Sequence, residues 1–280
     1  MDKTKRGKAI LYVVIASMLW STAGLLIKWV PWHPIAIAGI RSGIASMVML
    51  MFILVAHKKW PKKPDKSVLL ASANYVILVM LFVSANKLTT SANAILLQFT
   101  SPAWLMIIGA LFFKEKFVLK DIITVAVVFL GMILFFIGDI DGGGLLGNIL
   151  AIASGVSMAL MILSLKKVRG YNPIEIIFWG NLITFFVSIP FYGHVSMDSK
   201  GILGILLLGV FQLGISYLFY TNGIEKITAL EGILIPVVEP LLNPVWVFIG
   251  TGESPTAFAL LGGAVVLSAV IYHSLHEVRR

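Results

Sequence analysis

The chain has 280 residues, of which 59% are hydrophobic and only 12% are charged. Soluble domains carry about a quarter of charged residues, so this composition argues against a water-soluble protein. The absence of cysteine excludes disulfides and thiolate metal sites. The net charge of +9 lies in short basic clusters between apolar segments, which favours an orientation signal for a membrane chain over a nucleic-acid-binding face.

Apolar segments recur along the whole chain, each long enough as a helix of about 20 residues to cross about 30 Å of hydrocarbon. The first follows the basic start Met1–Lys8, but its apolar run is too long for a signal peptide, and we interpret it as a retained helix. The predicted spans are 8–28, 34–56, 68–86, 92–113, 118–138, 144–165, 173–192, 200–222, 230–250 and 256–275. The sequence therefore predicts an all-α integral membrane protein with about ten transmembrane helices.

The basic residues are distributed unevenly between the two sides of this arrangement. Of the 22 lysines and arginines, 18 fall on the inner side when the N-terminus is placed in the cytoplasm. The outer side holds only Lys28, Lys87 and Lys200, and Arg41 falls within a span. Because cytoplasmic loops are enriched in basic residues, both chain ends are predicted to be cytoplasmic and the number of spans to be even.

The two halves of the chain match weakly but in register on either side of the glycine run 142–144. Matching positions are separated by a nearly constant interval along the chain: Pro34 and Pro173, Lys87–Thr89 and Lys226–Thr228, Ser101-Pro102 and Glu239-Pro240, and Glu115 and Glu253. Each half holds five spans, an odd number, so the second copy enters the membrane from the opposite side. We predict two inverted five-helix repeats, at residues 7–140 and 144–275, an architecture from which alternating access is readily built.

Several short motifs occur in an order typical of one transporter family. They are Leu19-Trp20-Ser21 in the first span, Arg41 in the second, Gln98–Pro102 in the fourth followed by Glu115, and Glu239-Pro240 in the ninth followed by Glu253. Over residues 7–275 the chain resembles the ten-helix EamA-type branch of the drug/metabolite transporter superfamily. The resemblance implies a secondary transporter of amino acids, other small metabolites or drugs, with a central cavity lined by helices of both halves.

Glu239 is the acidic residue nearest the middle of a span. It lies about ten residues from either end of the ninth span, where a charged side chain costs at least ~2.5–3.5 kcal/mol. We predict that it faces the cavity and either binds a cationic group of the solute or carries the coupling proton. The alternative is a structural role, in which a protonated Glu239 caps carbonyls freed by Pro236, Pro240 and Pro244.

The two prolines Pro102 and Pro240 interrupt the fourth and ninth spans at corresponding depths, and such paired breaks are the best sequence indication of a transport site. Polar and aromatic side chains at helical spacing are predicted to shape the same site, although small hydroxyl residues also serve helix packing. Tryptophan could stack on a solute or a cation. The predicted site residues besides Glu239 are Trp20, Ser21, Gln98, Ser101, Trp104, Gln212, Tyr220 and Asn243.

Gating or structural roles are predicted for Arg41, Pro102, Pro240, Glu115 and Glu253. Arg41 lies about seven residues inside the second span, where it could reach outward, pair with an acid or hold a solute carboxylate, and we favour a structural or gating pair. Glu115 and Glu253 follow the ends of two spans and are predicted to form loop ion pairs that break as the cavity opens. The histidines lie near span ends without metal spacing, so neither a metal nor a cofactor is predicted.

These patterns predict a secondary active transporter of small metabolites in the cytoplasmic (inner) membrane, working by alternating access around a cavity at the membrane midplane. Its expected partners are a small solute, a coupling proton and the lipid bilayer, with no nucleic acid, and a monomer is the simplest assembly. A multidrug or quaternary-amine proton antiporter is the alternative. A membrane-embedded enzyme would need a nucleophile and base, paired carboxylates or metal ligands at depth, whereas the spans offer one clear acid and one arginine.

Overall fold

The computed structural model describes residues 3–135, 137, 144–196, 198–242, 246 and 257–277, and all regular structure within them is helical. Six helical segments of this part are long and apolar enough to cross a membrane, and shorter apolar helices occur at Pro173–Val187 and Leu260–His273. The predicted helical membrane fold is confirmed. The longer helices are α1 (Lys3–Trp20), α3 (Pro34–His57), α4 (Lys66–Leu88), α6 (Ser101–Phe113), α7 (Leu119–Phe135), α8 (Leu145–Lys167), α9 (Pro173–Val187) and α15 (Ala257–Glu277).

Four of the predicted spans consist of consecutive helical pieces. The first continues from α1 into α2 (Ala23–Trp29), and the fourth joins α5 (Ser91–Gln98) to α6. The eighth combines α10 (Ser199–Leu207), the π-helix η2 (Leu208–Ile215) and α11 (Ser216–Ile224). The ninth begins with α12 (Ala229–Leu234), the 3-10 helix η3 (Ile235–Val237) and α13 (Val238–Leu241), and the seventh span is followed by the 3-10 helix η1 (Ile189–His194).

Local sequence signals set where these helices begin. Asp65 caps α4 by accepting a hydrogen bond from the Val68 amide at 2.9 Å, and Asp198 caps α10 through the Gly201 amide at 2.7 Å. Thr228 caps α12 in a reciprocal arrangement with Glu231. Each such cap satisfies amide donors that have no partner inside the helix.

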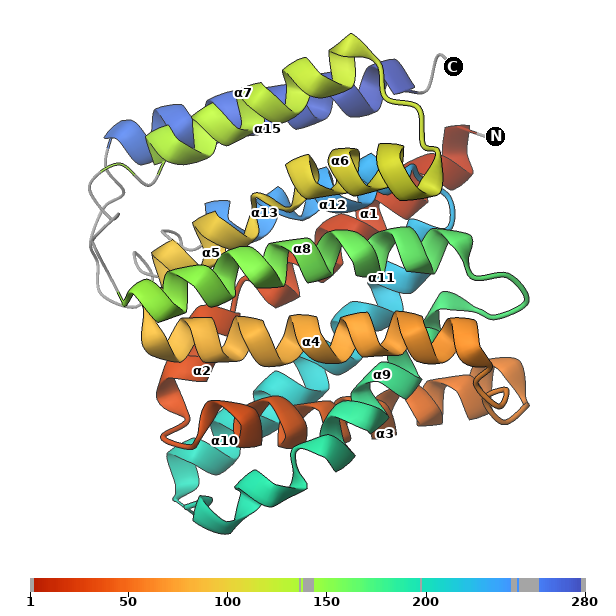
Figure 1. Ribbon diagram of the computed structural model, residues 1–280, viewed down its shortest axis with the longest axis vertical. Coiled ribbons are helices and arrows are strands. Elements are labelled where there is room, and N and C mark those ends of the chain that lie inside the picture. The colour runs from red at the N-terminus through yellow and green to blue at the C-terminus, as the bar shows by residue number, and fades with distance from the viewer. Residues whose placement is uncertain are drawn as a thin grey trace.

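The two halves of the chain make equivalent contacts with each other. Helix α1, the first span of the first half, packs on α11 from the third span of the second half. In the same way α8, the first span of the second half, packs on α4 from the third span of the first half, as Figure 1 shows across the middle of the bundle. The start of α1 and the end of α15 lie on the same side of the bundle (Figure 1), as an even number of crossings requires.

Helices α7 and α15 form a pair at one edge of the bundle, and they pack mainly on each other (Figure 1). Their backbones approach closely at Gly131 and Gly262, since a Cβ atom on Gly262 would lie 2.4 Å from the Phe135 nitrogen. Near one end, His273 Nε2 and Asp121 Oδ1 are 3.1 Å apart and both side chains are buried. Small residues at the crossing and a polar contact at its end are common means of pairing membrane helices.

Candidate functional site

A central cavity of about 60 Å³ lies between the two halves of the chain. Pockets that take drug-sized ligands measure about 300–1,000 Å³, so the cavity in this conformation is too small to hold such a ligand. It is lined by side chains from α1, α3, α4, α5, α8, η2, α11 and α13, namely Trp20, Arg41, Leu78, Val79, Phe82, Gln98, Met158, Met161, Gln212, Leu213, Tyr217 and Glu239. Four predicted site residues, Trp20, Gln98, Gln212 and Glu239, are therefore brought together, with Arg41 among them.

Arg41 is almost fully buried, with 2% of its surface exposed, and it lines the cavity from α3. Its Nη1 atom donates a hydrogen bond of 3.1 Å to Gln212 Oε1 on η2. Its Nε atom has no hydrogen-bond partner among the described residues. The side chain thus points into the bundle, and it retains a free donor for an additional acceptor.

Glu239 lies on α13 with 7% of its surface exposed, and it borders the same cavity. No described residue forms a hydrogen bond or an ion pair with its carboxyl group, and this includes Arg41. The cavity therefore combines a guanidinium and a carboxyl group that do not neutralise each other directly. Ionisable groups buried at membrane depth are costly and are usually retained for function.

An aromatic cluster forms one wall beside these two groups. The ring of Trp20 lies 5.0 Å from the ring of Tyr217 and 5.0 Å from that of Tyr220, measured between centroids. Tyr75 packs edge-on against Tyr217 and donates a hydrogen bond of 3.0 Å to Asn181 Oδ1. Tyr220 itself does not line the cavity, because its hydroxyl is directed to the Gly232 carbonyl at 3.0 Å.

The π-helix η2 explains why Tyr217 joins Gln212 in the cavity. In an α-helix the residues at i and i+4 share a face, and this spacing predicts the stripe Gln212, Ser216 and Tyr220. In a π-helix the backbone bonds run from i to i+5, which widens the turn. Gln212 and Tyr217 are five residues apart and both line the cavity, whereas Ser216 turns its hydroxyl to the Leu213 carbonyl at 3.1 Å.

Gln98 ends α5 at the break in the fourth span, and its Nε2 atom donates a hydrogen bond of 3.1 Å to Ser154 Oγ on α8. Ser101, predicted to share its face, is buried at the start of α6 and does not line the cavity; its hydroxyl has no partner among the described residues. The chain turns at Phe99 and Thr100 between the two helices, so the i, i+3 relation does not hold across the break.

Two further predicted site residues, Ser21 and Trp104, lie outside the cavity lining. Ser21 Oγ donates to the Met18 carbonyl at 2.6 Å and accepts from Trp246 Nε1 at 2.8 Å. Trp104 donates a bond of 3.2 Å to Thr100 Oγ1. Pro102 lies in the first turn of α6, Pro240 lies in α13 beside Glu239, and Asn243 falls outside the described residues.

The two acids predicted to form loop ion pairs have different outcomes. Glu115, in the loop after α6, pairs with Lys167 at the end of α8, with 2.7 Å between Oε1 and Nζ. Both side chains are substantially exposed, so this pair resembles surface ion pairs, which contribute little. Glu253 lies outside the described residues.

Sequence reasoning missed the apolar walls of the cavity. Leu78, Val79 and Phe82 from α4 form one side, and Met158 and Met161 from α8 form another. In spans that are apolar on every side, nothing in the sequence distinguishes a leucine or methionine that faces a cavity from one that faces lipid. Among the cavity residues that were missed, only Tyr217 could have been found from the sequence, because its hydroxyl is polar. Within the described part, no group of three or more acids and histidines has the arrangement of a metal site.

Comparisons with known proteins place this arrangement in a family. The model of the EamA-like transporter family matches twice, at residues 7–137 and 145–275. The chain is 26% identical over 265 residues to the uncharacterized transporter YdfC of Bacillus subtilis, covering 91% of this chain and 87% of the relative. It is 24% identical over 305 residues to the uncharacterized inner membrane transporter YicL of Salmonella typhimurium, covering 100% and 99%.

A solved crystal structure has the same fold, with a TM-score of 0.82 at 18% identity over 96% of this chain and 98% of that chain. The fold, the polar cavity between the two halves and the double match to one family model agree with one another. The chain belongs to the EamA-like transporter family, in the drug/metabolite transporter superfamily, and is a multi-pass membrane transporter of small solutes.

Proposed function

We propose that the protein is a secondary active transporter of amino acids or closely related zwitterions, which it carries across the cytoplasmic membrane by alternating access around the central cavity. The observation that carries the proposal is the presence of Arg41 and Glu239 in one cavity without a direct ion pair. An amino acid offers a carboxylate and an ammonium group on the same carbon, and it complements both charges at once.

Each end of such a solute has a suitable partner. A guanidinium binds carboxylates through paired, charge-assisted hydrogen bonds, and the Nε atom of Arg41 has no partner among the described residues. The carboxyl group of Glu239 can accept hydrogen bonds from an ammonium group. The rings of Trp20 and Tyr217 and the methionines of α8 provide an apolar wall for a side chain.

The alternative of a multidrug or quaternary-amine proton antiporter draws support from Glu239 and the aromatic wall, because cations bind to aromatic faces. Arg41 weighs against it. Its positive charge repels a cationic solute in the same small cavity, whereas a zwitterion offers a carboxylate that this charge attracts.

A thermal-shift experiment on the purified protein distinguishes these solutes. Each amino acid is tested beside its amide, which lacks the carboxylate, and beside the corresponding deaminated acid. We expect stabilisation by the intact amino acid, by about 2.7 kcal/mol at 100 times its Kd, and little by either analogue. Stabilisation by amines that lack a carboxylate would instead support the antiporter, and absence of stabilisation by every zwitterion tested would contradict the proposal.

Glu239→Gln tests the role of the acid itself. If Glu239 carries a coupling proton, solute exchange across the membrane should persist in this variant while accumulation driven by a pH gradient is lost. If it binds the ammonium group, binding of the amino acid should weaken as well. Unchanged binding and unchanged pH-driven transport would remove Glu239 from the mechanism.

A further inference from the structure

The starts of the fourth and ninth spans are held by the same set of contacts, although they belong to opposite halves. Thr90 caps α5 and Thr228 caps α12, and the interval between these two threonines equals that between Ser101 and Glu239. Lys28 Nζ donates a bond of 3.0 Å to the Thr89 carbonyl, and Lys166 Nζ donates one of 2.6 Å to the Ile227 carbonyl. The two lysines are separated by this same interval, and so are Thr89 and Ile227, whose carbonyls accept these bonds. The two junctions are therefore equivalent.

These two junctions lie at opposite ends of the cavity, and helix α8 shows their separation. Near its start, a Cβ atom on Gly147 would lie 2.8 Å from Thr89, which is the junction with Lys28. Lys166 is in its last turn. The helix has 23 residues, about 34 Å at 1.5 Å per residue, and the cavity residues Met158 and Met161 lie between the two junctions. We call the Thr89 junction the outer end and the Glu231 junction the inner end, as the basic residues predict.

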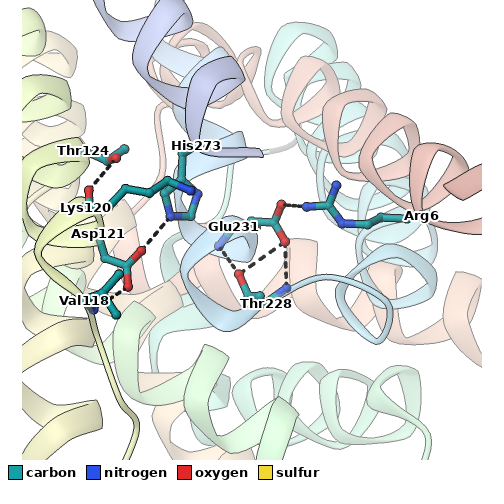
Figure 2. A network of polar contacts seen from close by, with 8 residues as sticks. All are labelled: Arg6, Val118, Lys120, Asp121, Thr124, Thr228, Glu231 and His273. Carbon is teal, nitrogen blue, oxygen red and sulfur yellow. Dashed lines mark hydrogen bonds and ion pairs between the residues drawn. The ribbon is translucent and has the colours of Figure 1, made fainter. Parts of the chain in front are cut away.

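At each end, the equivalent part of one half contacts the first span of the other half. At the inner end, Glu231 on α12 forms an ion pair with Arg6 on α1, and its second carboxylate oxygen accepts from the Thr228 amide at 3.0 Å (Figure 2). At the outer end, the Thr89 hydroxyl donates a bond of 2.8 Å to Asn148 Oδ1 on α8. Asn93, the repeat equivalent of Glu231, donates to the same hydroxyl at 3.4 Å.

We propose that these are the two gates of the transporter, with Arg6 and Glu231 closing the inner end and Thr89, Asn93 and Asn148 closing the outer end. The inference rests on the proposed alternating access, in which each end opens while the other stays closed. The Arg6–Glu231 and Thr89–Asn148 contacts join the two halves, so rocking of one half against the other must break them. With both sets of contacts formed, the cavity between the two ends measures only about 60 Å³.

The two gates differ in charge, which makes the inner gate the stronger one. Arg6 and Glu231 are buried, with 8% and 1% of their surfaces exposed, and acidic residues surround Lys166 close by. Among the described residues, the side chains assigned to the outer gate are neutral, and the lysines beside it, Lys28 and Lys87, repel each other. Charge-assisted hydrogen bonds are roughly twice as strong as neutral ones. The protein without solute should therefore open more often at its outer end.

Thiol labelling measures opening at each end without any solute. The chain has no cysteine, so Met158→Cys places a single thiol in the cavity. A charged, membrane-impermeant methanethiosulfonate is larger than the closed cavity, and its reaction rate in right-side-out or inverted vesicles reports opening toward one side. Arg6→Gln is compared with Lys8→Gln, which removes the same charge from an exposed position on the same helix.

We expect Arg6→Gln to raise labelling from the inner side about tenfold or more, because it leaves Glu231 buried without its partner. Arg6→Lys should restore slow labelling, and Lys8→Gln should leave it unchanged. Thr89→Val should raise labelling from the outer side only. Faster labelling from one side only would also exclude general unfolding of the protein as the cause of the increase.

The proposal is overturned if Arg6→Gln changes inner labelling no more than Lys8→Gln does, or if it raises labelling from the outer side instead. Because labelling needs no solute, it tests the proposed gates independently of the proposed solute. A normal labelling response in a protein that binds no zwitterion would contradict the proposed function and leave the gates intact. Zwitterion transport with unchanged labelling would contradict the gates alone.

Discussion

The two ends of the cavity have equivalent backbone contacts but different side chains. Arg6 and Gly144 are separated by the same interval as Asn93 and Glu231, and they lie in the first turn of α1 and directly before α8. At the inner end the long side chain of Arg6 reaches across to Glu231. At the outer end a Cβ atom on Gly144 would lie only 2.2 Å from the Leu88 carbonyl oxygen, so the backbones touch directly. If these ends are the proposed gates, the two halves differ in the contacts that close them although their helices pack in equivalent ways.

The largest expected effect compares the acid at the inner end with its neutral equivalent at the outer end. Glu231→Ala removes both the partner of Arg6 and the acceptor of the Thr228 amide at the start of α12, and a buried charge left unpaired costs about 3–5 kcal/mol. Asn93→Ala removes a neutral hydrogen bond to the Thr89 hydroxyl, worth about 1 kcal/mol. Thermal unfolding in the same detergent measures both, and equal losses would contradict the difference between the two ends.

A smaller effect is expected from the close backbone contact at the outer end. In Gly147→Ala the new methyl group would lie 2.7 Å from the Leu88 carbonyl carbon, and the resulting overlap should cost about 1–3 kcal/mol. Gly7→Ala is the matched control, because a Cβ atom at Gly7 meets nothing within 4 Å. Unfolding temperatures should fall for Gly147→Ala and stay level or rise slightly for the control. Equal changes of the unfolding temperature in the two variants would contradict the expected overlap at Gly147.

Ionic strength separates buried from exposed ion pairs at the inner end. Lys167→Gln removes the exposed pair with Glu115 and should lower the free energy of unfolding by less than about 1 kcal/mol, and this loss should vanish at high salt. The effect of Arg6→Gln should persist, since salt screens buried pairs much less. Unfolding measured at low and at about 1 M salt checks both. An effect of Arg6→Gln that salt abolishes would show that this pair is accessible to solvent.

The smallest effect is expected from the charge of the two capping aspartates, Asp65 at the start of α4 and Asp198 at the start of α10, and it should be equal for both. Hydrogen bonds from the Ser67 hydroxyl and the Val68 amide lower the pKa of Asp65, and those from the Gly201 amide and the Ser196 hydroxyl lower the pKa of Asp198. A lowered pKa in the folded state contributes stability above the unfolded value of about 3.9, and this stability is lost as the pH falls through the folded value.

Asp65→Asn and Asp198→Asn should therefore lower the unfolding temperature slightly near neutral pH and should match the parent protein at low pH. Asparagine is also a good cap, so only the contribution of the charge is lost. Unfolding temperatures between pH 3 and pH 7 measure the difference. A variant that stays less stable than the parent at the acid end would show that geometry, not charge, determines the effect.

Much of the fold could be predicted because the physical signal is strong. Ten apolar segments indicate a helical membrane fold, since lipid tolerates few charges, and the alternation of basic loops predicts the direction of the spans. The polar residues Gln98, Gln212 and Glu239 could be found for the same reason, because a polar side chain within an apolar span needs a partner or a cavity. These three, from different spans, border one cavity.

The remaining features depend on local backbone geometry that hydropathy does not reveal. The break at Ser21 and Thr22 directs Ser21 to Trp246, and the break before Ser101 separates that residue from Gln98. Arg41 was expected in a gating or structural pair, and its burial beside Gln212 depends on how closely α3 packs on η2. The motifs identified the spans that hold these residues, but they could not give the direction in which each side chain points.

The π-helix η2 also has a consequence for the length of the eighth span. A π turn contains about one residue more than an α turn, so the span carries a residue that an uninterrupted α-helix would not need. Deleting one residue within Leu208–Ile215 would restore α-helical register rather than break the helix. Every side chain beyond the deletion would then rotate by about 100° relative to those before it, and Tyr217 would turn away from Gln212. In this protein the additional residue of the π-helix therefore determines whether Tyr217 lines the central cavity beside Gln212.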